Sequence, residues 1–257
     1  MPLLCAGLTD RGVVRKTNQD SIFLNPEHKC FAVADGMGGH RGGDIASQLT
    51  VQTLTECFTK ASTDTAKVNL IRQAIQKANT LIFEKSQTES NLSGMGTTVV
   101  SLLVDKSKAY IANVGDSRCY LFNKKKIYQL SRDHSLVQEK MNLGIYTREE
   151  ASKDKMKNIL VRTLGFEEGV KIDFFEYTIS KNDLFLLCSD GLYGKVCDEE
   201  MNEIINHHLP KLEEASTEDL QQTVKTLIRR ANQYGGNDNI SVIMALAQSK
   251  AAAQETN

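Results

Sequence analysis

The stretch from Thr97 to Leu130 reads TTVVSLLVDKSKAYIANVGDSRCYLFNKKKIYQL, and it decides the fold class. It contains four apolar or alternating runs, each with the length and residue types of a β-strand. The connections between the runs are very short: Asp105-Lys106-Ser107, Val114 to Ser117, and Asn123 to Lys125. Short connections join antiparallel neighbours, because parallel strands need a long crossover. The stretch therefore predicts a mainly antiparallel sheet.

Strand-like runs and amphipathic helices continue on both sides of this stretch. The further strand-like runs are residues 3–8, 21–24, 30–34, 172–179, 184–188 and 240–246. Residues 68–82 and 220–231 repeat apolar side chains at three- and four-residue spacing, which predicts helices with one apolar face, and 43–58 predicts a third helix. Sheets covered by such helices form an α+β layered sandwich.

One segment, residues 131–164, has no strand pattern. A short helix is expected from near Ser135 to Gly144, and Thr147 with Glu150 forms a capping box that predicts a second helix. Surface insertions of this kind often cover a site. No linker divides the chain, so we expect one domain over 1–247, with 131–164 as a flap-like insertion and 248–257 as a polar tail.

Composition excludes some classes of function. The 257 residues carry 31 Lys and Arg against 32 Asp and Glu, a net charge of −1, which disfavours a nucleic-acid binder. The first residues lack the pattern of a secretory leader, and the longest apolar runs are too short to span a bilayer. We therefore expect a cytoplasmic protein with no membrane partner. The six cysteines form no C-x-x-C pair and are expected to be free thiols.

Four aspartates stand next to apolar strand-like runs. Asp35, Asp116 and Asp190 follow such runs, and Asp238 precedes the run 240–246. Carboxylates that converge on one rim of a sheet repel one another unless they are protonated or bridged by cations. Because all the candidate ligands are oxygens, a divalent site for Mg²⁺ or Mn²⁺ is indicated.

Seven short motifs occur in order along the chain, and together they cover nearly all of it. They are Thr9 to Asp20, Ala34 to His40, Gly94 to Thr98, Ala112 to Arg118, Leu160 to Gly165, Cys188 to Leu192 and Gly236 to Ile240. This set resembles the ordered motifs of the metal-dependent Ser/Thr protein phosphatases, the PPM or type 2C family, in its compact bacterial form. The resemblance implies a four-layer α-β-β-α sandwich, in which two mainly antiparallel sheets are flanked by helices.

The resemblance also implies a two-metal centre of Mg²⁺ or Mn²⁺ on one edge of the sandwich. Asp35 would bridge the two ions, Gly36 would offer a backbone carbonyl, and Asp190 with Asp238 would hold the second ion. Asp116, with Asp190, would hold a weaker third ion. The family often has an acidic residue four positions after Asp190, where this chain has Gly194.

The remaining roles surround these ligands. Asp20 and Gln19 would orient the metal-bound water, Arg15 would bind phosphate through its forked guanidinium, and His40 would be the general acid. The implied reaction is hydrolysis of phosphoserine and phosphothreonine in proteins by a hydroxide that bridges two ions. The expected partners are phosphorylated proteins, substrates of a Ser/Thr kinase, and the chain is expected to be a monomer.

Two alternative functions remain. Cys5 and Arg11 fit the C-x5-R spacing of a cysteine-dependent phosphatase, although Asp10 would then lie inside the anion cradle. A pseudophosphatase could bind phosphoproteins without hydrolysing them. Loss of activity in Cys5→Ser, with no effect of a chelator, would favour the first alternative, and binding without turnover would favour the second.

Overall fold

Two antiparallel sheets form the centre of the computed structural model, which describes residues 2–37, 42–61 and 66–248. The first sheet has the order β1-β11-β10-β7-β8, and its strands are β1 (Leu3–Asp10), β11 (Ile240–Ala247), β10 (Leu184–Cys188), β7 (Arg118–Asn123) and β8 (Lys126–Gln129). The second has the order β2-β3-β5-β6-β9, with β4 paired to β3. Its strands are β2 (Asp20–Asn25), β3 (Cys30–Met37), β4 (Gly96–Thr97), β5 (Val99–Asp105), β6 (Lys108–Val114) and β9 (Asp173–Thr178).

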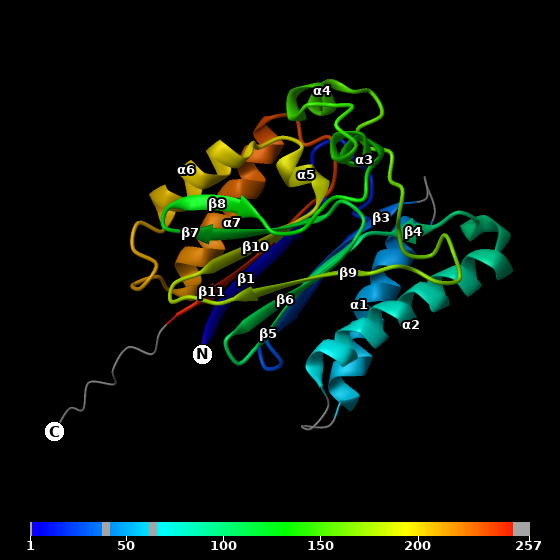
Figure 1. Cartoon of the computed structure of the whole chain (residues 1–257), viewed down its shortest axis with the longest axis horizontal. Coiled ribbons are helices and arrows are strands. Elements are labelled where there is room, and N and C mark those ends of the chain that lie inside the picture. The colour runs from blue at the N-terminus through cyan, green and yellow to red at the C-terminus, as the bar shows by residue number, and fades with distance from the viewer. Residues whose placement is uncertain (1, 38–41, 62–65, 249–257) are drawn as a thin grey trace.

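Helices cover the outer face of each sheet (Figure 1). The helices α1 (Gly43–Lys60) and α2 (Lys67–Thr88) lie on the second sheet, and the short 3-10 turn η1 (Ser90–Leu92) follows them. The helices α5 (Asp190–Tyr193), α6 (Asp198–His208) and α7 (Thr217–Gln233) lie on the first sheet. The described helices include none that is long and apolar enough to cross a membrane.

Three apolar clusters hold these layers together. One lies between the sheets and contains Phe31 and Val100 from one sheet and Leu187 and Ile243 from the other. The second packs α1 and α2 onto their sheet, and the third does the same for α6 and α7. Because apolar side chains project from both faces of each sheet, each sheet needs a covering layer on both sides. The predicted four-layer α-β-β-α sandwich is confirmed.

One predicted connection is wrong. The short link from Val114 to Ser117 does not join antiparallel neighbours, because β6 belongs to the second sheet and β7 to the first. Gly115 turns the chain there with a φ of +101°, a conformation that favours glycine. By contrast, the links β5–β6 and β7–β8 are antiparallel hairpins, as predicted.

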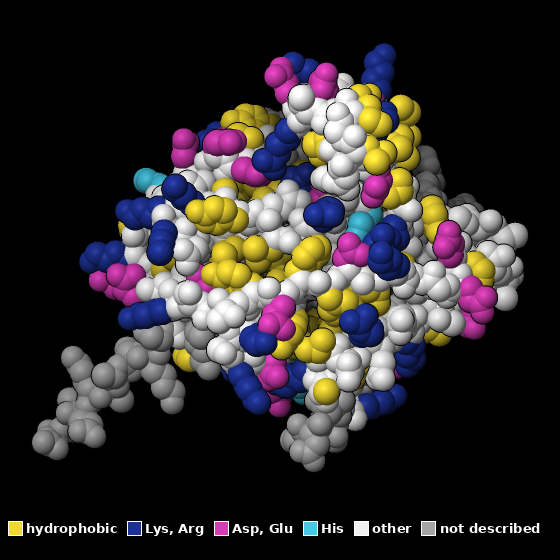
Figure 2. Space-filling view, viewed as in Figure 1, with side chains coloured by type: hydrophobic (Ala, Val, Ile, Leu, Met, Phe, Trp, Pro, Cys, Tyr) yellow, Lys and Arg dark blue, Asp and Glu magenta, His cyan; other side chains and the backbone are white. Residues whose placement is uncertain are grey.

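The insertion 131–164 contains the two expected helices, α3 (Leu136–Asn142) and α4 (Arg148–Lys153). Ser135 caps α3 by accepting a hydrogen bond from the Gln138 N–H, and Thr147 and Glu150 form the predicted capping box of α4. The insertion stands at the same end of the molecule as α5 (Figure 1). Its surface carries exposed charged side chains, among them Arg148 and Lys153, and hydrophobic side chains also gather over it in Figure 2. The exposed hydrophobic ones include Leu143, Ile145, Met156, Ile159 and Val161.

Candidate active site

Five aspartates lie at strand ends near one edge of the two sheets. Asp20 begins β2 and is directly opposite Asp35 in the pairing of β2 with β3. Asp116 follows β6, Asp190 follows β10 as the first residue of α5, and Asp238 precedes β11. The charges of Asp35, Asp116, Asp190 and Asp238 act on one another, which supports their predicted convergence, and Asp20 joins them.

The pKa values of four of these carboxyl groups, those of Asp20, Asp35, Asp116 and Asp190, are raised. Burial, with the charges of Asp190 and Asp238, raises the pKa of Asp20 to about 7. Burial and the charges of Asp190 and Asp133 raise the pKa of Asp116 to about 8. Burial and the charge of Asp238 raise the pKa of Asp190 to about 6.

Asp35 is at the centre of this electrostatic cluster. Burial raises its pKa well above the usual range, and the charges of Asp20, Asp190, Asp116 and Asp238 all act in the same direction. A group of buried carboxylates is costly when each carries an uncompensated charge, and either protons or cations relieve that cost.

The acidic edge fits a divalent cation by the chemistry of its donors. One oxygen of Asp20 and one of Asp190 are buried without a hydrogen-bond partner, so each has a free acceptor position. All the donors are oxygens, which suit Mg²⁺ or Mn²⁺. Within the described part of the chain, no group of three or more His, Cys, Asp or Glu side chains is close enough to count as a ready-made metal site. The ligand set is therefore a proposal.

Backbone geometry around Asp35 is tightly determined. The Gly36 N–H donates to the Gln19 carbonyl at 3.1 Å, and a Cβ at Gly36 would lie 2.0 Å from the Gly43 carbonyl oxygen. Only glycine permits this approach of three main-chain segments. The Asp35 carbonyl accepts a hydrogen bond from the Thr97 hydroxyl at 2.8 Å, so the strand end that presents Asp35 is held in place.

Arg15 lies in the loop before β2 and contacts the acidic edge. Its Nη2 is 2.7 Å from Asp238 Oδ2, and its Nε donates to the Asn237 carbonyl at 3.2 Å. Although burial opposes its charge, the hydrogen bond to Asp238 and the charges of Asp190 and Asp35 raise the pKa of Arg15. About half of the Arg15 side chain is exposed, so this guanidinium can reach an incoming anion.

Other residues that hold the site were not predicted from the sequence. Asn239 anchors the Arg15 loop: its side-chain amide donates to the Arg11 and Thr17 carbonyls, and its oxygen accepts from the Gln19 N–H at 2.8 Å. The Ser189 hydroxyl donates to Asp20 Oδ2 at 2.7 Å. Asn239 follows Asp238 and Ser189 precedes Asp190, and this adjacency to candidate ligands was the signal in the sequence that could have identified both residues.

A second group lies beside Asp116. Arg118 forms a forked contact with both oxygens of Asp133, and its guanidinium stacks 3.6 Å from the centroid of the Tyr193 ring. Tyr193 in turn hydrogen-bonds to Asp116. These contacts join three segments of the chain, at residues 116–118, 133 and 193, and no local pattern in the chain indicates them.

His40, the expected general acid, lies outside the described residues, so its position relative to the aspartates is untested. Gly194 ends α5, where its N–H donates to the Asp190 carbonyl at 2.8 Å. It presents no carboxylate toward Asp116, consistent with the departure seen in the sequence.

The structure argues against a cysteine nucleophile. Cys5 lies within β1, paired with Ala245, and packs against the cluster between the sheets. Burial raises the pKa of its thiol, whereas a nucleophilic cysteine needs a lowered pKa.

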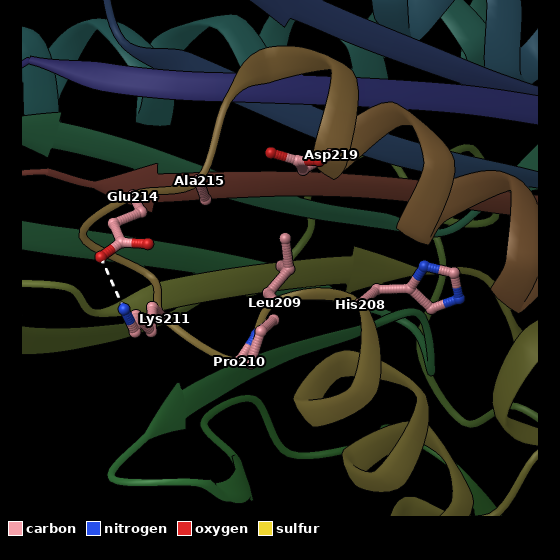
Figure 3. A pocket seen from close by; sticks show the side chains of 7 residues that line it. All are labelled: His208, Leu209, Pro210, Lys211, Glu214, Ala215 and Asp219. Atoms are coloured by element: carbon pink, nitrogen blue, oxygen red, sulfur yellow. Dashed lines mark hydrogen bonds and ion pairs between the residues drawn. The ribbon is translucent and has the colours of Figure 1, made fainter.

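A surface hollow lies away from the acidic edge. It has a volume of about 340 Å³ and is lined by residues between the end of α6 and the start of α7, among them His208, Lys211 and Asp219 (Figure 3). Helix α7 separates this hollow from the loop that carries Asp238, a length of about 25 Å for 17 residues at 1.5 Å each. The hollow therefore does not contribute to the acidic edge.

Comparison with known proteins identifies the class. The family model described as protein phosphatase 2C matches residues 13–244. The chain is 40% identical over 242 residues to the serine/threonine phosphatase stp of Listeria welshimeri, covering 92% of each chain. It superposes with a TM-score of 0.86 on the serine/threonine phosphatase Stp1 from Staphylococcus aureus, at 32% identity and covering 96% of each chain.

A further structural neighbour was solved with metal. The catalytic domain of the serine threonine protein phosphatase PstP, in complex with two manganese ions, superposes with a TM-score of 0.83 at 31% identity, covering 96% of this chain and 99% of that one. Fold and acidic edge together define the class as a metal-dependent phosphatase. The chain belongs to the protein phosphatase 2C family.

Proposed function

We propose that this chain hydrolyses phosphoserine and phosphothreonine in proteins, using divalent cations bound at the acidic edge. The observation that carries the proposal is the cluster of five aspartates: the charges of Asp20, Asp116, Asp190 and Asp238 all raise the pKa of the buried Asp35, and Arg15 pairs with Asp238. The relatives, which are serine/threonine phosphatases by name, support the same substrate class, phosphorylated proteins.

The first group of residues would bind the cations. Asp35, the Gly36 carbonyl, Asp190 and Asp238 would hold two cations, and Asp116 would contribute to a weaker third site. When bound, Mg²⁺ or Mn²⁺ supplies Lewis acidity that activates water and offsets phosphoryl charge. The unpartnered oxygens of Asp20 and Asp190 support this arrangement.

The other polar groups would act on water and phosphate. Asp20 and Gln19 would orient water at the edge, and the half-exposed guanidinium of Arg15 would bind two phosphoryl oxygens. Asp238 neutralises Arg15 while no phosphate is present. His40 would donate a proton to the departing serine or threonine oxygen.

We also propose that residues 1–247 act as one catalytic domain, with 131–164 as a flap beside the site. The exposed apolar side chains of this segment could contact the peptide on either side of the phosphorylated residue. The chain would act as a monomer.

The test is a metal-titrated assay on phosphoserine, phosphothreonine and phosphotyrosine peptides. Asp35→Ala, Asp190→Ala and Asp238→Ala should each lower kcat at least about a hundredfold, typical when a group that stabilises transition-state charge is removed. Asp105→Ala is the matched control, because Asp105 ends β5 beside a surface hairpin and should leave kcat unchanged. Unchanged activity in the three variants at saturating metal would refute the proposal. Tight phosphopeptide binding without turnover in wild type would favour a pseudophosphatase.

A further inference from the structure

His134 is a buried histidine at the base of the flap, the insertion 131–164, and only 3% of its surface is exposed. The ring Nδ1 of His134 is 3.0 Å from the Gly115 backbone nitrogen. The backbone N–H of His134 donates to the Gly115 carbonyl at 2.9 Å. A backbone N–H can only donate, so Nδ1 must be the acceptor and Nε2 must carry the hydrogen of the neutral ring. One residue therefore holds both main-chain polar groups of Gly115.

The other side of the ring faces β9 and the end of the flap. Nε2 is 3.2 Å from Asp173 Oδ2, while Arg162 Nη1 is 2.7 Å from Asp173 Oδ1. Arg162 Nη1 also lies 2.9 Å from Nε2, and because both atoms are donors, each is satisfied by its own oxygen of Asp173. Asp173 thus holds the ring in one orientation.

The main chain of the same segment closes the base of the flap. The Val161 N–H donates to the His134 carbonyl at 2.9 Å, and the Leu136 N–H donates to the Ile159 carbonyl at 2.8 Å. Ser135 and Leu160 form an isolated antiparallel bridge between these bonds. The two ends of the flap therefore meet at His134.

Gly115 is the link between this assembly and the acidic edge. It carries a φ of +101° at the point where the chain crosses from one sheet to the other, and the next residue is Asp116. Fixing both polar groups of Gly115 leaves the following residue little freedom of direction. The histidine ring thus stands between the base of the flap and the aspartate turn.

We propose that His134 is a positioning residue that holds the Gly115–Asp116 turn in a fixed relation to the base of the flap. Through Nδ1 it sets the direction of Asp116, and through Nε2 and Asp173 it aligns the flap against β9. The part that concerns catalysis rests on the proposed phosphatase function, whereas the clamp on Gly115 does not.

Two substitutions distinguish the contact of Nδ1 with Gly115 from the contact of Nε2 with Asp173. In His134→Asn the side-chain oxygen can occupy the place of Nδ1 and still accept from Gly115, but the contact with Asp173 is lost. In His134→Gln the amide reaches the place of Nε2, but Gly115 loses its acceptor. The matched control is His28→Asn, because His28 lies in the turn between β2 and β3, at the end opposite to the Asp20–Asp35 pair.

The first measurement is amide hydrogen exchange at Gly115 in the metal-free protein. We expect His134→Gln to exchange at least about tenfold faster than wild type, the effect of losing one buried acceptor, while His134→Asn and His28→Asn stay near wild type. Equal exchange in the Asn and Gln variants would overturn the clamp. This result does not depend on the protein being a phosphatase.

The second measurement is the split between kcat and KM at saturating Mn²⁺, for para-nitrophenyl phosphate and for a phosphothreonine peptide. We expect His134→Gln to lower kcat about tenfold for both substrates. His134→Asn should keep kcat near the wild-type value for both substrates and raise only the KM for the peptide. If both variants lose thermal stability without this split, His134 is merely structural and the positioning role is wrong. If wild type shows no turnover while the exchange pattern holds, the proposed function fails and the clamp stands.

Discussion

At the scale of single residues, the site is defined by charges that compensate one another. Arg15 pairs with Asp238 at 2.7 Å, so the only side chain we assign to phosphate binding is already held next to a proposed metal ligand. Under the proposed function, a bound cation would replace Arg15 as the partner of Asp238, and phosphoryl oxygens would replace Asp238 as the partner of Arg15. The pair therefore keeps both groups in place before the substrate arrives.

Replacing Arg15 by Ala should lower kcat/KM for a phosphothreonine peptide by roughly tenfold to a hundredfold, the range expected for one or two charge-assisted hydrogen bonds. Arg15→Lys should recover part of the loss, because an ammonium keeps the charge without the fork. Steady-state kinetics at saturating metal measure both, with Lys16→Ala as a control for charge in the same loop. Equal kinetics for Arg15→Ala and Lys16→Ala would remove Arg15 from phosphate binding.

Replacing Cys5 by Ser should leave kcat/KM within about twofold of wild type, because the thiol lies in β1 and burial raises its pKa. A chelator should abolish the activity of wild type and variant alike. The opposite pattern, an inactive Cys5→Ser with an enzyme that resists the chelator, would establish the cysteine mechanism.

At the scale of elements, turns and helix caps determine where the strands end and therefore where their aspartates lie. Gly115 moves the chain between the sheets, and an added Cβ would lie 2.6 Å from the Thr98 side chain. The helix cap at Thr147 follows from local sequence and forms as predicted, and Ser216 caps α7 through the same kind of capping box. By contrast, nothing local distinguishes the turn at Gly115 from a hairpin turn.

Gly115→Ala should lower the free energy of unfolding by about 2 kcal/mol, since the positive φ and the contact with Thr98 both oppose a side chain. It should also weaken activity, because the direction of Asp116 changes. Ser216→Ala removes the cap of α7 and should cost about 1 kcal/mol with no loss of kcat. Urea unfolding and kinetics on both variants make the comparison. Equal kcat in the two would show that the Gly115 turn does not govern the site.

At the scale of the whole molecule, the four layers bring five carboxylates to one edge, and the resulting repulsion has a pH signature. The pKa values of Asp190, Asp20 and Asp116 rise to about 6, 7 and 8 from an ordinary value of 3.8. Carboxyl groups with raised pKa values bind protons more tightly in the folded state. Their contribution to stability is therefore present at low pH and is lost as the pH rises through these values.

The metal-free protein should thus show a lower Tm at about pH 8 than at about pH 6. Added Mn²⁺ should raise Tm more at the higher pH, since cations replace the lost protons. Burial lowers the pKa values of His134 and His208, so these groups reduce stability as the pH falls below about 6.5 and act in the opposite direction at pH 6. A lower Tm at pH 8 than at pH 6 therefore reports the carboxyl groups. Thermal melts with and without chelator measure the effect. A Tm gain from Mn²⁺ that is the same at both pH values would contradict the predicted coupling.

Much of the fold is present in local sequence. Alternation and short turns predict the strands, three- and four-residue spacing predicts α2 and α7, and Ser135 and Thr147 mark the starts of α3 and α4. These features depend on neighbours in the chain, so the pattern contains them. The aspartates Asp35, Asp116, Asp190 and Asp238 were also identifiable, because each adjoins an apolar strand.

Only the tertiary structure decided which strands pair and what surrounds each aspartate. The link at Gly115 was predicted as a hairpin, yet β6 and β7 lie in different sheets, because the apolar faces of both strands need partners distant in sequence. Asn239, Ser189, Arg118 and His134 likewise gain their roles from segments far along the chain. Sequence alone determined the acidic residues and the elements that carry them. The packing of the two sheets determined how those residues are buried, how they pair and in which direction they point, because burial and charge coupling depend on distance in space.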